Sequence, residues 1–493
     1  MKIVLKGRRN LGMKGAALYQ FGSKYISMGV QILITAVLAR ILAPEEFGLV
    51  AIVSVFTALF SLFSDMGIGN AIVQYQNLSE EDYGALFGFS VVLAVGLTVG
   101  FCAISPLIAM FYSDSRLMLL CCVSSPTLLF STLNMVPEGL MLKGRRFDLI
   151  GFRLVVATVI SGSVAIAMAL RGWGAISLVL QTAMSTLVVL TWNLVSRPIR
   201  HISFHFKKPL NKISSYSAYQ FGFTLINYFS RNLDNMLVGR FLGNDQLGYY
   251  DKAYKLTTYP MSAFSSVIGS VIQPYMAEHQ DEPDVIFDCF LKIYKLISLI
   301  GVMVATVCFC ASGEIVEVLY GPGWEPSIPV FAVLSISIYF QMMGNPSSAF
   351  FQSLGRTDYM FRVGLINTGL TITGLFVGLA GGSIQTVAYG VGMAYCLHIV
   401  SIIYYLVWRG FGKSPSCLRI FVPEICVGVI AGVVCEAVFS LVKLPVIISL
   451  LVKSTLLLLI FFVYYWKSGQ IQYLRHLLPR QFSGKSGPRK VHQ

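Results

Sequence analysis

The sequence predicts an all-α polytopic membrane protein with about fourteen transmembrane helices, twelve of them in two six-helix repeats. Three observations predict this class: the composition, an internal duplication and the distribution of positive charge. Of the 493 residues, 55% are hydrophobic and 12% are charged, and the mean hydropathy is +0.70. A single soluble core cannot bury that much apolar surface, so the chain is expected to lie in a bilayer.

The duplication is visible at an offset of 200 residues. The motif Tyr19-Gln20-Phe21-Gly22 recurs as Tyr219-Gln220-Phe221-Gly222. The same offset aligns further identical residues, namely Ile26 with Ile226, Leu33 with Leu233, Arg40 with Arg240, Leu42 with Leu242 and Gly48 with Gly248. Chance would give roughly two or three matches in such a stretch. Six helices lie between the copies, so both copies enter the membrane in the same direction, as in two-lobed transporters with a path between the lobes.

Runs of about 20 apolar residues mark the expected helices. They begin near Leu18, Phe47, Ala85, Leu117, Ile150, Ala175, Ser217, Leu256, Phe290, Ile328, Val363, Ile384, Ile420 and Val446. The basic, Pro-containing segment before the second copy predicts a lobe boundary. The expected organisation is a basic cytoplasmic N-terminus (1–17), a first lobe with helices one to six (18–196), a cytoplasmic linker (197–216), a second lobe with helices seven to twelve (217–409), two further helices (420–466) and a basic cytoplasmic tail (467–493).

The positive charge follows membrane topology rather than a nucleic-acid surface, although the net charge is +14. If the N-terminus is cytoplasmic, the cytoplasmic segments hold 24 Lys and Arg residues and the outer loops hold seven. The positive-inside rule then places both termini in the cytoplasm. Membrane lipids, and not nucleic acid, are the expected partners of this charge.

A polar stripe on the first helix of each lobe is the main candidate for a substrate site. In the first lobe its members follow spacings of three and four and form one helical face: Gln20, Lys24, Ser27, Gln31 and Thr35. The positions 200 residues further on are Gln220, Thr224, Asn227, Arg231 and Asn235, with Asp234 beside the last. Because polar groups facing lipid are costly, the matched stripes are expected to face each other across a hydrated cavity.

The second helix of each lobe repeats the pattern more weakly. Its polar residues are Ser54, Thr57, Ser61 and Asp65 in the first lobe, and Thr258, Ser262, Ser265 and Gln273 in the second. These helices are expected to line the same path. The alternative is that each hydroxyl bonds back to its own helix or joins neighbouring helices.

The ionisable members of the stripes are the sharpest evidence, since a charge near the bilayer centre costs about 3 kcal/mol. Lys24 and Arg231 would present positive charge to an anionic headgroup, with Arg suited to bidentate phosphate contact. Asp65 and Asp234 would hold these cations in the empty state, or bind a coupling proton or Na⁺. Two alternatives stay open: Arg231 and Asp234 form an internal ion pair, and Lys24 extends to the cytoplasmic headgroups.

The other polar residues considered as functional candidates are expected to have structural roles. His398 is expected to be a hydrogen-bonded packing residue, and His201 and His205 lack further ligands, so no metal site is expected. Glu436 and Lys453, in the two extra helices, are expected to pair with each other or to touch lipid. No Walker motif, Gly-rich nucleotide loop or catalytic triad occurs, so neither ATP-driven transport, nor an enzyme, nor a cofactor is expected.

A further set of motifs carries a family resemblance. They are the run Ala39-Arg40-Ile41-Leu42-Ala43-Pro44-Glu45-Glu46-Phe47-Gly48, then Asp65-Met66-Gly67, Arg231-Asn232-Leu233-Asp234-Asn235, Gly239-Arg240-Phe241-Leu242-Gly243, Leu247-Gly248-Tyr249-Tyr250, and Leu319-Tyr320-Gly321 with Trp324. On these motifs, over about residues 10 to 440, the chain resembles the polysaccharide transporter branch of the MOP superfamily. It resembles especially the Wzx-type flippases of lipid-linked oligosaccharides in the colanic acid exporter group.

The resemblance implies a MOP/MATE-like two-lobed bundle in the bacterial inner membrane. It implies alternating access that moves an undecaprenyl-diphosphate-linked oligosaccharide to the periplasmic leaflet, driven by an ion gradient or the membrane potential. Carried over residue by residue, diphosphate contact falls on Lys24 and Arg231, with Asp65 and Asp234 as acidic partners. The sequence departs from the family in having few cations in the first lobe. The diphosphate is therefore expected to be held partly by neutral donors, namely Gln31, Asn227 and Asn235. The last two helices resemble those that shape a groove for the polyprenyl tail in the related peptidoglycan lipid flippases.

Three other functions compete with this one. A multidrug or ion antiporter of the same superfamily would favour an acidic, aromatic cavity, which Lys24 and Arg231 oppose. A membrane polysaccharide polymerase or ligase would need a long outer loop rich in catalytic Arg, His or Asp, and the expected outer loops are short. A structural partner of polysaccharide polymerase or other assembly proteins is the third alternative.

Overall fold

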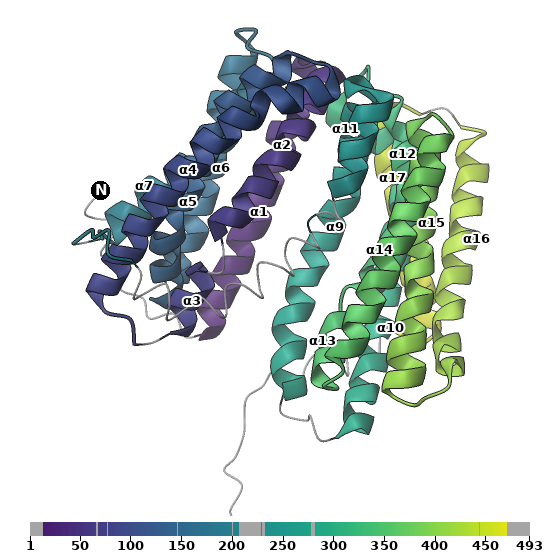
Figure 1. Ribbon diagram of the computed structural model, residues 1–493. Helices are drawn as coiled ribbons and strands as arrows, with labels where there is room; N and C mark the ends of the chain where they lie inside the picture. Colours follow the sequence, from purple (N-terminus) through teal and green to yellow (C-terminus); the bar gives the residue numbers. More distant parts are fainter. Residues whose placement is uncertain are drawn as a thin grey trace, which may run out of the picture. The chain divides into compact units, whose positions relative to one another are not determined.

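The computed structural model describes residues 13–65, 68–75, 77–144, 146–199, 201–206, 228, 232–277, 282–442 and 444–470, with side chains at 13–18, 20, 65, 70, 71 and 263–277 left out. All regular secondary structure in these residues is helical (Figure 1). Within them, twelve helices are long and apolar enough to cross a membrane. The protein is therefore an all-α multi-pass membrane protein, as its composition predicts.

The chain divides into two compact units. The first comprises Met1–Asp251 and Leu319–Trp324, and the second comprises Lys252–Val318 and Glu325–Gln493. The described helices of the first unit are α1 (Met13–Ile41), α2 (Pro44–Asp65), α3 (Ile68–Gln74), α4 (Glu80–Tyr112), α5 (Arg116–Lys143), α6 (Phe147–Ala169), α7 (Ala175–Ser196) and the first turns of α9 (Asn244–Ala277). Within it, α5 packs against α4 and α7, and α6 packs against α1 and α7 (Figure 1).

The turn between α4 and α5 positions several polar groups of the first unit. Helix α4 starts with a capping box formed by Ser79 and Asp82. It ends at Ser113, whose backbone is left-handed with φ of 57°. The chain then reverses within three residues and enters α5 at Arg116. This tight reversal places Asp114 and Arg116 at one end of the helical bundle.

The second unit contains the remaining helices. They are the rest of α9, α10 (Pro283–Cys310), α11 (Ser312–Tyr320, up to Val318), α12 (Ser327–Gly344), α13 (Ser347–Ser353), α14 (Thr357–Ala380), α15 (Ile384–Ile402) with its π-helical continuation η2 (Ile403–Gly410), the 3₁₀ turn η3 (Pro415–Phe421), α16 (Val422–Phe439) and α17 (Val446–Lys467). Helices α14 and α15 pack side by side, and α10 packs against α12, α16 and α17 (Figure 1).

Three helices start clearly earlier than predicted. The ninth and eleventh helices, expected near Phe290 and Val363, start at Pro283 and Thr357, and the eighth differs most. The eighth helix, expected near Leu256, starts at Asn244. Its first three turns carry Asp245, Asp251, Lys252 and Lys255, so a search for apolar runs begins too late. The seventh predicted helix lies mostly outside the described residues, as does the linker 197–216, so the predicted lobe boundary stays a prediction.

Candidate functional site

Two glycines related by the duplication meet in the first unit. Gly48 lies in the second turn of α2 and Gly248 lies at the start of α9. A Cβ on Gly48 would overlap the carbonyl oxygen of Asn244, and a Cβ on Gly248 would overlap that of Pro44. Positions 44 and 244 are themselves related by the offset of 200, so the contact has internal two-fold symmetry. Only glycine permits so close a crossing of two backbones.

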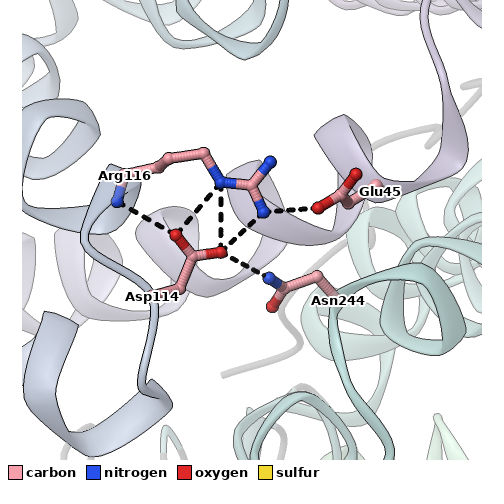
Figure 2. A network of polar contacts seen from close by, with 4 residues as sticks. All are labelled: Glu45, Asp114, Arg116 and Asn244. Carbon is pink, nitrogen blue, oxygen red and sulfur yellow. Dashed lines mark hydrogen bonds and ion pairs between the residues drawn. The ribbon is translucent and has the colours of Figure 1, made fainter.

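An ionic network lies around the first turn of α9, beside this crossing (Figure 2). Arg116 donates hydrogen bonds to both carboxylate oxygens of Asp114, at 3.0 Å from Nε and 2.7 Å from Nη2. The same Nη2 pairs with Glu45 on α2. Asn244 donates from Nδ2 to Asp114 Oδ2 at 2.9 Å. Asp114 therefore links the first helical turn of α9 to the α4–α5 turn.

The electrostatics of this network favour the ionised carboxylate. The hydrogen bonds from Arg116 outweigh partial burial and hold the pKa of Asp114 below its ordinary value. Arg116 and Glu45 are about half exposed. Their pair is therefore screened by solvent and contributes little by itself.

Trp324 fills the space next to the crossing. Its side chain is 1% exposed, and its indole Nε1 donates to the carbonyl oxygen of Ala39 at 3.0 Å. Its ring lies edge-on to Phe47, with 5.4 Å between centroids, and to Tyr249, with 5.8 Å between centroids. Residues 47 and 249 adjoin the two crossing glycines. We call the crossing, the Asp114 network and Trp324 the closure.

The first-lobe stripe residues lie apart from the closure, further along α1. Lys24 is exposed and Gln31 is half-buried. Gln31 donates to Thr35 Oγ1 at 3.4 Å and accepts from Gln181 Nε2, on α7, at 3.5 Å. Ser27 Oγ is buried and has no hydrogen-bond partner among the described residues. The stripe thus continues onto α7 through Gln181, which the sequence analysis did not include.

Only part of the second-lobe stripe can be placed. Asp234 is buried, and its carboxylate accepts from the Tyr250 hydroxyl at 3.1 Å and from the Asn235 backbone N–H at 2.8 Å. Asn235 Oδ1 is buried and lacks a partner within the described part of the chain. Asn227, Arg231 and the side chain of Asp65 lie outside the described residues. Their roles stay predictions, and so does an ion pair between Arg231 and Asp234.

The hydroxyls of the second helices bond mainly to their own helices. Thr57 donates to the Val53 carbonyl at 2.8 Å and Ser61 to the Thr57 carbonyl at 2.9 Å. In α9, Thr258 and Ser262 make the same kind of bond, at 2.8 and 3.0 Å. These groups need no hydrated cavity to be satisfied, as the back-bonding alternative predicts.

The first unit contains a buried ion pair with hydrogen-bonded neighbours that the sequence did not predict. Arg153 on α6 is 4% exposed and donates to both oxygens of Glu138 on α5, at 2.5 and 2.6 Å. It also bonds to Asn193 on α7, whose Nδ2 donates to Asn134 Oδ1 at 2.7 Å. Glu138 and Arg153 lie on either side of the α5–α6 turn, each about five residues inside its helix. Charged residues within apolar segments are the sequence feature that could have indicated this buried network.

Two ion pairs fix the helices α16 and α17 to the rest of the second unit. Glu424, fully buried near the start of α16, pairs with Lys295 on α10. Lys453 on α17 pairs with Glu314 on α11 at 2.7 Å. Burial raises the pKa of Glu314, but the hydrogen bonds from Lys453 and Ser449 outweigh it and lower the pKa. Lys453 therefore pairs with Glu314 and not with Glu436, so the first of the two alternatives expected for Lys453 and Glu436 is wrong.

An apolar groove of about 470 Å³ lies between α10, α12 and α16. Its lining includes Val302, Thr306, Phe309, Tyr339, Phe340, Ile425, Gly428, Gly432 and Val433. Glu436 lies at its edge as a rare acidic group. The two glycines of α16, Gly428 and Gly432, face α10: a Cβ on Gly428 would overlap Val302, and a Cβ on Gly432 would lie at contact distance from Thr306.

His398, on α15, is hydrogen-bonded within the second unit. His398 Nε2 lies 2.9 Å from the Asn367 carbonyl and 3.1 Å from Thr371 Oγ1, as expected for a packing residue. In the described ranges, no group of three or more His, Cys, Asp and Glu side chains is arranged to hold a metal ion.

The fold of this chain is similar to the folds of solved helical membrane transporters. The fold matches the lipid II flippase MurJ in an inward closed conformation, with a TM-score of 0.76 and 12% identity over 93% of this chain and 99% of that one. It also matches an inward-facing multidrug resistance MATE family transporter of the MOP superfamily, with a TM-score of 0.60 and 15% identity over 78% of this chain and 96% of that one.

The sequence comparisons identify the family. Residues 37–329, more than half of the chain, match the family described as Polysaccharide biosynthesis protein, and the chain belongs to it. The teichuronic acid biosynthesis protein TuaB of Bacillus subtilis (strain 168) is 26% identical over 80% of this chain and 81% of its own length. The lipopolysaccharide biosynthesis protein WzxC of Escherichia coli (strain K12) is 26% identical over 72% of each chain. The family resemblance seen in the motifs is thereby confirmed.

Proposed function

We propose that this protein is a flippase that moves a polyprenyl-diphosphate-linked oligosaccharide, a repeat unit of a cell-surface polysaccharide, across the inner membrane. The observation that carries the proposal is the symmetric crossing of two duplicated helices at Gly48 and Gly248, in a chain of the polysaccharide biosynthesis family. Two duplicated helices that cross at one close contact are suited to alternating access, because separating them there needs no change inside either helix.

The proposed headgroup site lies along the two polar stripes. Lys24 is exposed on α1, and Gln31 with Gln181 offers neutral hydrogen-bonding groups beside it. In the second lobe, Arg231 and Asn227 are the proposed phosphate contacts, together with Asn235, whose amide oxygen lacks a hydrogen-bond partner among the described residues. Asp65 and Asp234 are the proposed gating or coupling acids. Asp234 is buried and accepts a hydrogen bond from Tyr250, and its proposed role is to bind a coupling cation or proton.

The proposed site for the polyprenyl tail is the groove between α10, α12 and α16. Its lining is almost wholly apolar, so a hydrocarbon chain can lie there without desolvating polar groups. The ion pairs at Glu424 and Lys453 keep α16 and α17 docked. The groove is therefore a fixed feature of the second unit.

The proposal also covers the membrane topology, the energy source and the partners of the protein. Both termini are cytoplasmic, by the charge bias of the loops, and transport uses an ion gradient or the membrane potential. Membrane lipids and polysaccharide polymerase or assembly proteins are the proposed partners. No catalytic activity is proposed.

The experiment is a flipping assay in proteoliposomes. A fluorescent polyprenyl-diphosphate oligosaccharide is placed in the inner leaflet, and its arrival outside is followed with a membrane-impermeant periodate reaction. We expect protein-dependent transfer, slowed about tenfold or more by Arg231→Ala, because a lost charged contact to phosphate costs about 2–5 kcal/mol. Arg171→Ala, in a loop outside the stripes, is the control. Transfer no faster than in protein-free vesicles contradicts the proposal.

A further inference from the structure

The segment Leu319–Trp324 occupies an unusual place in the chain. It comprises the last two residues of α11 and the start of the loop to α12, and it belongs to the first unit although the chain on either side of it belongs to the second. Gly321 and Gly323 have φ of 83° and 89°, a backbone conformation that favours glycine and lets the loop turn tightly. A Cβ on Gly321 would lie 3.3 Å from Cγ of Arg40, so the loop passes close beside the end of α1.

The contacts of Trp324 reach both copies of the duplicated sequence. Ala39 and Phe47 come from the first copy, and Tyr249 comes from the second. Phe47 directly precedes Gly48, and Tyr249 directly follows Gly248. The indole therefore lies between the two residues that adjoin the crossing. The crossing backbones cannot separate while Trp324 keeps all three contacts.

The contacts of Trp324 are of kinds that allow its side chain to leave this position. One hydrogen bond and edge-on ring contacts hold Trp324, and such contacts break and re-form without covalent change. The neighbouring Asp114 network contains half-exposed groups that solvent screens. Trp324, in contrast, is 1% exposed, so solvent does not screen its contacts beside the crossing.

We propose that Trp324 is a latch. It holds the ends of the two repeats together on the outer side of the membrane, and it leaves its pocket before the path opens on that side. The part of this inference that concerns opening toward the outer side rests on the proposed flippase function. The holding role of Trp324 can be tested without transport.

The first test is cysteine labelling at Ala39, which is buried beside Trp324. Cells carrying Ala39→Cys react with a membrane-impermeant maleimide, with the parent protein as background for its ten native cysteines. We expect Trp324→Ala to raise the labelling rate at least tenfold, and Trp324→Phe about threefold, since Phe keeps the ring and loses the N–H donor. Trp173→Ala, an exposed residue after α6, is the control.

Folding of each variant is checked by size-exclusion chromatography. Trp324→Phe keeps the test valid where Trp324→Ala does not fold, because a similar ring still fills the pocket. Labelling rates equal to that of Ala39→Cys alone, in folded Trp324 variants, overturn the latch.

The second test asks whether the latch opens during transport. Labelling of Ala39→Cys is compared in cells that make the lipid-linked oligosaccharide and in cells that do not. We expect at least threefold faster labelling with substrate. Equal rates, in a variant that still transports, overturn the latch. If the protein moves no such lipid, the proposed function fails, while the first test still reports whether Trp324 holds the closure.

Discussion

Single residues decide how closely α2 approaches the start of α9 within the first unit. Gly48 and Gly248 bring two backbones together where any side chain would overlap a carbonyl oxygen of the other helix. The crossing therefore depends on the absence of two methyl groups. Trp324 and Asp114 then stabilise the contact that the glycines permit.

Gly48→Ala is predicted to weaken the closure. The added methyl overlaps the Asn244 carbonyl, and overpacking of this kind costs about 1–3 kcal/mol. We expect a lower melting temperature and faster labelling at Ala39→Cys. Gly29→Ala is the matched control, because Gly29 is also helical and has open space around its Cβ position. An unchanged Gly48→Ala protein contradicts the close crossing.

The contribution of Asp114 to folding stability is predicted to depend on pH. Its pKa is lowered in the folded protein by the bonds from Arg116, so the folded state binds this proton more weakly than the unfolded state. The stabilisation is complete above the ordinary Asp pKa of about 4 and is lost as the pH falls below it. We expect the melting difference between wild type and Asp114→Asn to be constant from pH 5 to 8 and to shrink below about pH 4. A difference that changes near neutral pH disagrees with this account.

Arg153 and Glu138 form a structural pair rather than a substrate site, since Arg153 is almost fully buried. Removing one partner leaves an uncompensated charge, so Glu138→Leu and Arg153→Met are each predicted to destabilise by about 3–5 kcal/mol. The double variant is predicted to recover most of this loss. Thermal unfolding of the three proteins measures the coupling, and simple additivity of the two losses speaks against a pair.

At the scale of elements, α16 and α17 are docked on the second unit by charge and line a groove with α10 and α12. Gly428 and Gly432 of α16 both line this groove, and Gly428 also lets α16 pack closely against Val302 of α10.

Gly432→Leu is predicted to obstruct tail binding without unfolding the protein. The nearest atoms to a Cβ at Gly432 are at ordinary contact distances of 3.7 and 3.8 Å, so a larger side chain extends into the groove. We expect flipping of a full-length polyprenyl substrate to slow about tenfold, and that of a short-tailed analogue to change little. Val434→Leu, an exposed residue outside the groove, is the control. Equal slowing of both substrates argues against a tail site.

The elements could be predicted from apolar runs because membrane helices must satisfy their own backbones over about 20 residues. The same method failed at the start of α9, where four charged residues precede the apolar stretch. The duplication aligned Gly48 with Gly248, but sequence alone could not show that the two glycines touch. Gln181 and Arg153 were missed because their partners lie 150 and 40 residues away along the chain.

At the scale of the whole molecule, duplication supplies matched helices, and the polysaccharide biosynthesis family supplies the class of substrate for the proposal. The cation sites proposed for the diphosphate come from both copies, at Lys24 and Arg231. The central claim is therefore that the intact chain moves a lipid-linked oligosaccharide from the cytoplasmic to the outer leaflet.

The most direct measurement is the sidedness of that lipid in cells lacking the protein and in cells complemented with wild type, Arg231→Ala or Asp234→Ala. The account predicts that the intermediate accumulates on the cytoplasmic leaflet without the protein, and that Arg231→Ala fails to relieve this at normal expression. An intermediate that reaches the outer leaflet normally but stays unpolymerised would contradict it, and would identify an assembly enzyme or partner instead.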